Sequence, residues 1–206
     1  MPWDDLLIVA ALAMRLVVRQ LLEPISLELA FGLYLAAMLV LLPVLVWRMR
    51  RSRAALGLTR GDLAGSLRAT ALLLPLVLAQ AAANAWQLTG RLALAPLWLI
   101  GLALLNGLVT AALPEEVLFR GVLLARLRRA GASPWQAIAV QGALFAAGHM
   151  RYPLAGQWLL FGNVTVLGLL LGWLALRYRT LAGPIALHTL SNAAIFALLG
   201  GTIQRL

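Results

Sequence analysis

The sequence contains no cysteine and no lysine, and only 7 of its 206 residues are acidic. Without cysteine the chain can form no disulfide, no thiolate metal site and no cysteine nucleophile. No aspartate follows Asp62, so a pair of aspartates cannot act within the later part of the chain. The sequence also lacks the H-E-x-x-H pattern of a zinc-binding helix and the G-x-S-x-G turn of a serine hydrolase. These absences exclude most of the catalytic sites that are common in hydrolases.

What the sequence does contain is apolar: 63% of residues are hydrophobic and 12% are charged. Soluble domains average about 45–50% apolar and about 25% charged residues. Apolar runs near helix-spanning length occur at about 6–22, 27–47, 69–89, 95–113, 135–149, 158–176 and 181–199. We therefore expect an all-α, polytopic membrane helix bundle with about seven to eight transmembrane helices, the eighth arising if Pro114 breaks the long apolar stretch.

The whole chain, 1–206, is predicted to be a single membrane-embedded domain whose motif-bearing core spans about 95–200. Its acidic start and the lack of a small-residue cleavage site indicate a retained first helix, not a cleaved signal peptide. Arginines gather in the loops around 48–68, 126–129 and 177–179. With seven helices these loops share one side, which the positive-inside bias makes cytoplasmic. The net charge of +10 is thus explained by topology, and no nucleic acid partner is expected.

Ionisable groups at membrane depth are costly and indicate function by default. The first such group is Pro114-Glu115-Glu116-x-x-x-Arg120, interpreted as a helix that opens after the proline. Glu116 and Arg120 are four residues apart and can pair on one face. Glu115 points about 100° away and is not neutralised by that arginine. The alternative interpretation is a salt bridge that only fixes a helix end.

Two further motifs carry the only histidines of the chain. Phe145 and His149 share a helix face, extended by Gln141, and His188 and Asn192 are again four residues apart. Taken alone, either motif could equally have a structural role, as a buried histidine or as residues that form hydrogen bonds between helices. Counted at 1.5 Å per residue from the nearest loops, Glu115, His149, His188 and Asn192 fall in one central band of a membrane core about 30 Å thick. We expect the four side chains to line one water-accessible pocket.

Such a pocket suits hydrolysis of an amide by activated water. Glu115, with His149, would act as general base, while His188 and Asn192 would donate hydrogen bonds to the developing oxyanion. Two other functions fit the same groups: a proton- or ion-coupled transporter, and a non-catalytic membrane protein that binds a partner. An inverted repeat would favour the transporter, and the sequence shows none.

The three motifs in this order resemble the signatures of CPBP intramembrane proteases, the family of type II CAAX prenyl endopeptidases and bacterial Abi proteins. The resemblance covers about 95–200. It implies an intramembrane endopeptidase with a site opening toward the cytosol, with Glu115, His149, His188 and Asn192 as catalytic residues and Glu116 and Arg120 as supporting residues. The same resemblance implies three properties associated with members of the family: CAAX-box protein processing, metalloendopeptidase activity and bacteriocin immunity. The expected partners are the lipid bilayer and a peptide or protein substrate, lipid-anchored ones included, in a bacterial plasma membrane.

No metal or other cofactor is expected to be required. The alternative is a zinc ion held by Glu115, His149 and His188 with one open position. Metal-bound imidazoles are usually oriented by a carboxylate or carbonyl behind them. Because Glu116 is expected to pair with Arg120, the sequence leaves no carboxylate to orient both imidazoles.

Overall fold

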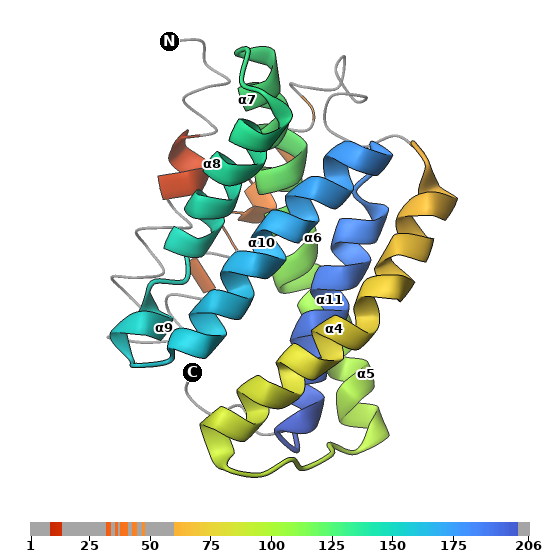
Figure 1. Cartoon of the computed structure of the whole chain (residues 1–206), viewed down its shortest axis with the longest axis vertical. Helices are drawn as coiled ribbons and strands as arrows, with labels where there is room; N and C mark the ends of the chain where they lie inside the picture. The colour runs from red at the N-terminus through yellow and green to blue at the C-terminus, as the bar shows by residue number, and fades with distance from the viewer. Residues whose placement is uncertain are drawn as a thin grey trace.

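The computed structural model describes residues 60–201, together with residues 9–13 and a few positions between 32 and 47. Figure 1 shows a bundle of helices in these residues. The long ones are α4 (Leu63–Thr89), a continuous helix from Leu97 to Arg129, and α10 (Trp158–Tyr178), each long and apolar enough to cross a membrane. The shorter apolar α11 (Ala182–Leu198) packs along α4. The chain is therefore a helical membrane protein. The predicted runs 6–22 and 27–47, with Arg15 and Arg19, lie mainly outside the described residues, so the count of seven to eight helices stays a prediction.

Local sequence signals explain where these helices begin and end. The Asp62 side chain caps α4 by accepting a hydrogen bond from the backbone of Gly65 (2.8 Å), and Gly90 ends the helix in the left-handed conformation (φ +67°). In α8 (Pro134–Ala147), Ser133 and Gln136 form a reciprocal capping box. Gly131 (φ +91°) supplies the turn between α7 (Leu124–Arg129) and α8.

Pro114 does not break the long helix, which corrects the expectation of two pieces. The helix runs through α5 (Leu97–Asn106), η3 (Gly107–Ala112), α6 (Leu113–Glu116), η4 (Val117–Leu123) and α7 without interruption. The segments η3 and η4 are π-helical, with the wider i to i+5 hydrogen-bond spacing. A wider turn relieves the steric clash and the lost hydrogen bond that a proline causes inside an α-helix.

The bundle has two chemically different ends. The backbone nitrogen of Asp62 donates a hydrogen bond to the carbonyl of Tyr178 (2.9 Å), so the start of α4 lies beside the end of α10. At the other end, Ala93 donates to the carbonyl of Leu198 (3.0 Å). We call the first the arginine end, because seven arginines lie at or near it: Arg60, Arg68, Arg126, Arg128, Arg129, Arg177 and Arg179. It is uppermost in Figure 1, and the opposite end, with α5 and α9 (Arg151–Leu154), is lowermost.

The packed core lies mostly toward the arginine end. One cluster joins α4, α10 and α11 through Val77, Leu171, Leu174 and Leu187. A second joins the η4–α7 segment to α8 and α10 through Leu124, Ile138, Ala175 and Leu181. Large apolar side chains elsewhere, such as Leu72 and Leu97, point outward and are more than 80% exposed, as expected for helices that face lipid.

Candidate active site

A cavity of about 480 Å³ lies between α4, α5, α10 and α11 and reaches the end of α8. Glu115, His149, His188 and Asn192 all line it. They come from three separate segments: α6 (Glu115), the turn after α8 (His149) and α11 (His188 and Asn192). The structure therefore brings together the four side chains that the sequence places at similar depth. Their convergence is a geometric observation and does not by itself assign a catalytic role to any of them.

The first motif forms a buried ion pair beside this cavity. The Arg120 guanidinium donates from Nη1 to Glu116 Oε1 at 2.7 Å, and neither side chain is exposed. Its Nη2 donates to the carbonyl of Gly168 on α10 at 2.9 Å. The predicted pairing is present, and it does more than fix a helix end, because it also attaches the long helix to α10.

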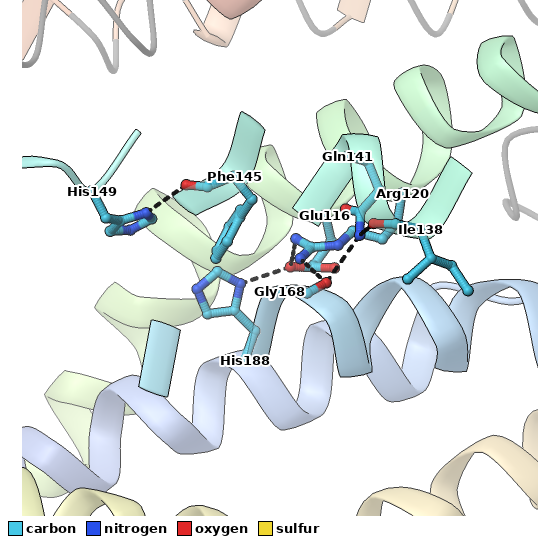
Figure 2. Close-up of polar contacts among 8 residues, drawn as sticks. All are labelled: Glu116, Arg120, Ile138, Gln141, Phe145, His149, Gly168 and His188. Atoms are coloured by element: carbon cyan, nitrogen blue, oxygen red, sulfur yellow. Dashed lines mark hydrogen bonds and ion pairs between the residues drawn. The ribbon is translucent and has the colours of Figure 1, made fainter. Parts of the chain in front are cut away.

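Glu116 has a second partner that the sequence did not reveal. The same oxygen, Oε1, lies 2.7 Å from Nδ1 of His188 on α11 (Figure 2). A carboxylate oxygen accepts, so Nδ1 of His188 carries the hydrogen and its other ring nitrogen, Nε2, faces away from Glu116. This corrects the expectation that Glu116 is occupied by Arg120 alone. The carboxylate orients one imidazole and holds the arginine at the same time.

His149 lies just beyond α8, in a turn, and not inside the predicted helix. Its Nδ1 is 2.8 Å from the carbonyl of Phe145. A carbonyl oxygen only accepts, so Nδ1 donates, and in the neutral ring the lone pair is on Nε2. Tyr152 of α9 stacks on the imidazole with centroids 5.8 Å apart. The ring is thus fixed in both tautomer and orientation.

Phe145 occupies the centre of the site and was not among the predicted site residues. Its ring centroid is 4.9 Å from that of His149 and 5.8 Å from that of His188. The Arg120 guanidinium carbon lies 4.3 Å from the same centroid, within cation–π range. Figure 2 shows the phenyl ring standing between His149 and the Glu116–Arg120 pair. The spacing Phe145-x-x-x-His149 was visible in the sequence, but the contacts with the other two motifs were not.

Gln141, which the sequence placed on the same face, is fully buried. Its Nε2 donates to the carbonyls of Ile138 (3.0 Å) and Gly168 (3.0 Å). The Gly168 carbonyl therefore accepts hydrogen bonds from both Gln141 and Arg120. Close approach at this point requires glycine, since a Cβ at position 168 would lie 2.9 Å from the Phe145 ring.

The remaining wall of the cavity combines apolar and amide side chains. The Asn163 amide nitrogen of α10 donates to the Asn84 side-chain oxygen of α4 at 2.8 Å. Other residues that line the cavity were likewise not predicted. The polar ones are Gln80, Asn106, Thr110 and Ser191. The apolar ones are Leu99, Leu102, Leu160, Ile195 and Phe196. Single amides in apolar helices are a weak sequence signal because interhelical hydrogen bonding explains most of them. Here they add hydrogen-bonding groups to an otherwise apolar chamber.

The alternative zinc set does not fit the observed geometry. Among the residues that the structure describes, no three His, Asp, Glu or Cys side chains lie close enough to hold a metal ion. The expectation that no carboxylate orients both imidazoles holds only in part: Glu116 orients that of His188, and the Phe145 carbonyl orients that of His149. The reaction that we propose for this site involves no metal-dependent step.

Comparison with known proteins agrees with the motifs. Residues 95–194 match the family model described as Rce1-like, type II CAAX prenyl endopeptidase Rce1-like. The matched region runs from the beginning of the long helix into α11 and contains all six predicted site residues. No curated protein and no solved structure gives a significant match.

Proposed function

Through residues 95–194 the chain belongs to the Rce1-like family of type II CAAX prenyl endopeptidases, and we propose that it hydrolyses a peptide bond with a water molecule activated by Glu115 and His149. The family match supports an intramembrane peptidase in general. The residue roles are proposed from the site geometry. The observation that carries them is the convergence of Glu115, His149, His188 and Asn192 on one cavity.

In the proposed reaction, water in the cavity attacks the carbonyl carbon of the scissile bond. Glu115 accepts a proton from that water, and His149, whose lone pair is on Nε2, shares the general-base work. A carbon–oxygen bond forms and a tetrahedral oxyanion develops. The carbon–nitrogen bond then breaks as the proton passes to the leaving amine, which leaves a new carboxylate and a new amino terminus.

His188 and Asn192 stabilise the oxyanion in this scheme. Asn192 donates from its side-chain amide, and His188 donates from Nε2 when both ring nitrogens carry hydrogen. Glu116 supports that doubly protonated ring because its carboxylate accepts from Nδ1 at 2.7 Å. Donors fixed in advance and buried from bulk water are effective because they need no reorganisation during the reaction.

The test is cleavage of a membrane-anchored peptide library by purified protein in lipid nanodiscs. Glu115→Gln is expected to abolish turnover while the variant keeps its unfolding temperature, because the amide preserves size but cannot act as a base. Asn192→Ala is expected to lower kcat by about 100- to 1,000-fold, the typical loss for one oxyanion donor. Gly162→Ala, on α10 with no atom within 4 Å of the added methyl group, is the matched control and should cleave normally.

Full activity in Glu115→Gln would refute the assignment of the base. Proton flux into proteoliposomes that is lost in His149→Ala, with no cleavage, would support the transporter instead. Partner binding that survives a Glu115→Ala, His188→Ala double variant, again without cleavage, would support the binding protein.

We further propose a bacterial plasma membrane as the location, because all 17 lysine-or-arginine positions of the chain are arginine. The substrate is proposed to be a membrane-associated peptide or protein. The bacterial Abi and bacteriocin-immunity roles within the wider family remain predictions for this chain.

A further inference from the structure

A second pocket, of about 570 Å³, lies at the arginine end of the bundle, where η4 and α7 face α8 and the end of α10. It is separate from the candidate active site, because the two cavities share no lining residue. On the long helix it is lined from Arg120 to Arg129, a length of roughly 13 Å. On α10 it is lined from Trp173 to Arg177, one residue before the helix ends at Tyr178. The pocket therefore reaches from the helix ends into the bundle.

This second pocket has an apolar floor and a basic rim. The buried side chains of Leu124, Ile138 and Leu181 form the floor. Four exposed arginines form the rim, two from α7 and two from the end of α10: Arg128, Arg129, Arg177 and Arg179. A ligand that fills the pocket must therefore combine an anionic group with an apolar part.

Acidic side chains do not balance the charge of the rim. None of the described residues that line the pocket is acidic, and residues 60–201 contain only Asp62, Glu115 and Glu116 as acids. The first caps α4, and the other two belong to the candidate active site. Within the described chain, Arg128 and Arg129 donate hydrogen bonds to backbone carbonyls and form no ion pair. Since a guanidinium is always ionised in proteins, the rim carries excess positive charge.

Arg120 extends this charge to the inner wall of the pocket, where its side chain is 2% exposed. Its Nη1 donates to Glu116 and its Nη2 to the carbonyl of Gly168. The remaining donor, Nε, is buried and has no hydrogen-bond partner among the described residues. A buried donor without an acceptor is costly, so the inner wall also favours an anionic ligand.

We propose that this second pocket binds one anionic phospholipid, with its phosphate at the four rim arginines and the first part of its acyl chains on the apolar floor. Guanidinium groups suit phosphate because their planar fork of N–H donors matches two phosphate oxygens. A free phosphate ion would leave the floor in contact with water, whereas a phospholipid covers it. Trp135, 69% exposed, and Trp173 line the same pocket, and tryptophan is enriched at the level of lipid headgroups. Basic pockets between membrane helices are typical sites for such headgroups. The inference does not depend on the peptidase reaction.

Native mass spectrometry measures this binding directly. The purified full-length protein in detergent is titrated with dioleoylphosphatidylglycerol and, in parallel, with dioleoylphosphatidylcholine. The two lipids have the same acyl chains, and only the first has a net negative headgroup. We expect one phosphatidylglycerol molecule to be retained with a Kd about tenfold or more below that of phosphatidylcholine, because only the anionic lipid neutralises the rim. Equal retention of the two lipids would overturn the proposal.

Paired variants locate the site. Arg128→Gln with Arg177→Gln removes one rim charge from each of two helices and should weaken phosphatidylglycerol binding by about 10- to 30-fold, since each arginine near an anionic lipid contributes roughly fivefold. Arg60→Gln with Arg68→Gln is the matched control: both arginines are exposed near the same end, neither lines the pocket, and the net charge changes equally. The control pair should change the Kd by less than about threefold. Equal losses in the two pairs would mean diffuse surface charge and no site.

A second pair, Arg129→Gln with Arg179→Gln, should give the same loss and keeps the test decisive if the first pair does not fold. Arg120 is left unchanged because it also holds Glu116.

Competitors identify the source of the anionic group. Inorganic phosphate and glycerophosphoglycerol, which lack acyl chains, should not displace phosphatidylglycerol at equal concentration. Displacement by either would assign the pocket to a soluble phosphate compound, and displacement by a hexaglutamate peptide would assign it to an acidic protein segment. Either result would overturn the lipid proposal.

Lipid binding and catalysis fail separately in this design. Phosphatidylglycerol binding should be unchanged in Glu115→Gln, since it requires no turnover. Binding without peptide cleavage would refute the peptidase proposal alone. Cleavage without selective retention of phosphatidylglycerol would refute the lipid site alone.

Discussion

Replacing Glu116 with glutamine should damage stability and activity through two separable effects. Glu116 is fully buried and its Oε1 accepts hydrogen bonds from both Arg120 and His188 at 2.7 Å. Glu116→Gln leaves the Arg120 charge, 2% exposed, without its directly hydrogen-bonded counter-ion, and only the weaker charge interaction with Glu115 remains. Removing one partner of a buried ion pair typically costs about 3–5 kcal/mol, and we expect a loss of that order in the free energy of unfolding.

The activity effect has a different origin. An amide can present either an oxygen or an NH2 group to His188, and the oxygen is claimed by Arg120. With the NH2 group facing it, Nδ1 must accept, and the hydrogen of the neutral ring moves to Nε2. The neutral ring can still donate from Nε2 to the oxyanion, but it no longer carries the positive charge that Glu116 supports, and hydrogen bonds from charged donors are roughly twice as strong. Removing an oxyanion donor altogether typically lowers kcat by about 100- to 1,000-fold, so we expect a smaller loss, on the order of 10- to 100-fold, because the donor is weakened and not removed.

A double variant separates the two effects. Arg120→Met added to Glu116→Gln removes the stranded charge, and the Gly168 carbonyl keeps its hydrogen bond from Gln141 (3.0 Å). Replacing a whole buried ion pair with apolar groups is often neutral or stabilising. Denaturant unfolding in detergent should therefore show the double variant to be more stable than Glu116→Gln alone, while its kcat stays low. Additive losses of stability in the double-variant cycle, or full activity in Glu116→Gln, would refute this account.

Three further predictions concern packing and cofactors. Gly168→Ala places a methyl group 2.9 Å from the Phe145 ring and should cost about 1–3 kcal/mol by overpacking, whereas Gly162→Ala on the same helix should be neutral by thermal unfolding. Asn163→Leu breaks the 2.8 Å hydrogen bond to Asn84 and should lower unfolding stability by roughly 1 kcal/mol; an unchanged stability would mean that this bond contributes nothing. Prolonged treatment with EDTA or phenanthroline should leave peptide cleavage unchanged, and activity restored specifically by added zinc would contradict the metal-free scheme.

The sequence predicted the parts of the fold that depend on local pattern. The run 158–176 corresponds to α10 and the run 181–199 to α11, each within two residues at either end. The set of four cavity residues followed from spacing and depth. Pro114 was misjudged because proline usually ends a helix, whereas π-helical winding accommodates it here. The start of α4 at Leu63, six residues before the predicted run, places Arg68 in the helix and not in the loop.

Long-range contacts were beyond the reach of sequence reasoning. Spacing reveals partners four residues apart, such as Glu116 and Arg120, but nothing in it indicates that Glu116 meets His188, 72 positions later. The central place of Phe145 was hidden for the same reason.

The winding of the long helix decides which carboxylate does which task. Glu115 lines the cavity while its neighbour Glu116 lies in the packed network, and both follow the π-helical segment η3. Rewinding one turn of η3 as ordinary α-helix would rotate everything after it by about 100° relative to the preceding half, which is the angle between two consecutive side chains. Since a π-helical turn holds about one residue more than an α-turn, deleting one residue from η3 would let it rewind as α-helix with the later half almost unrotated, whereas the same rewinding without a deletion would turn Glu115 away from the cavity.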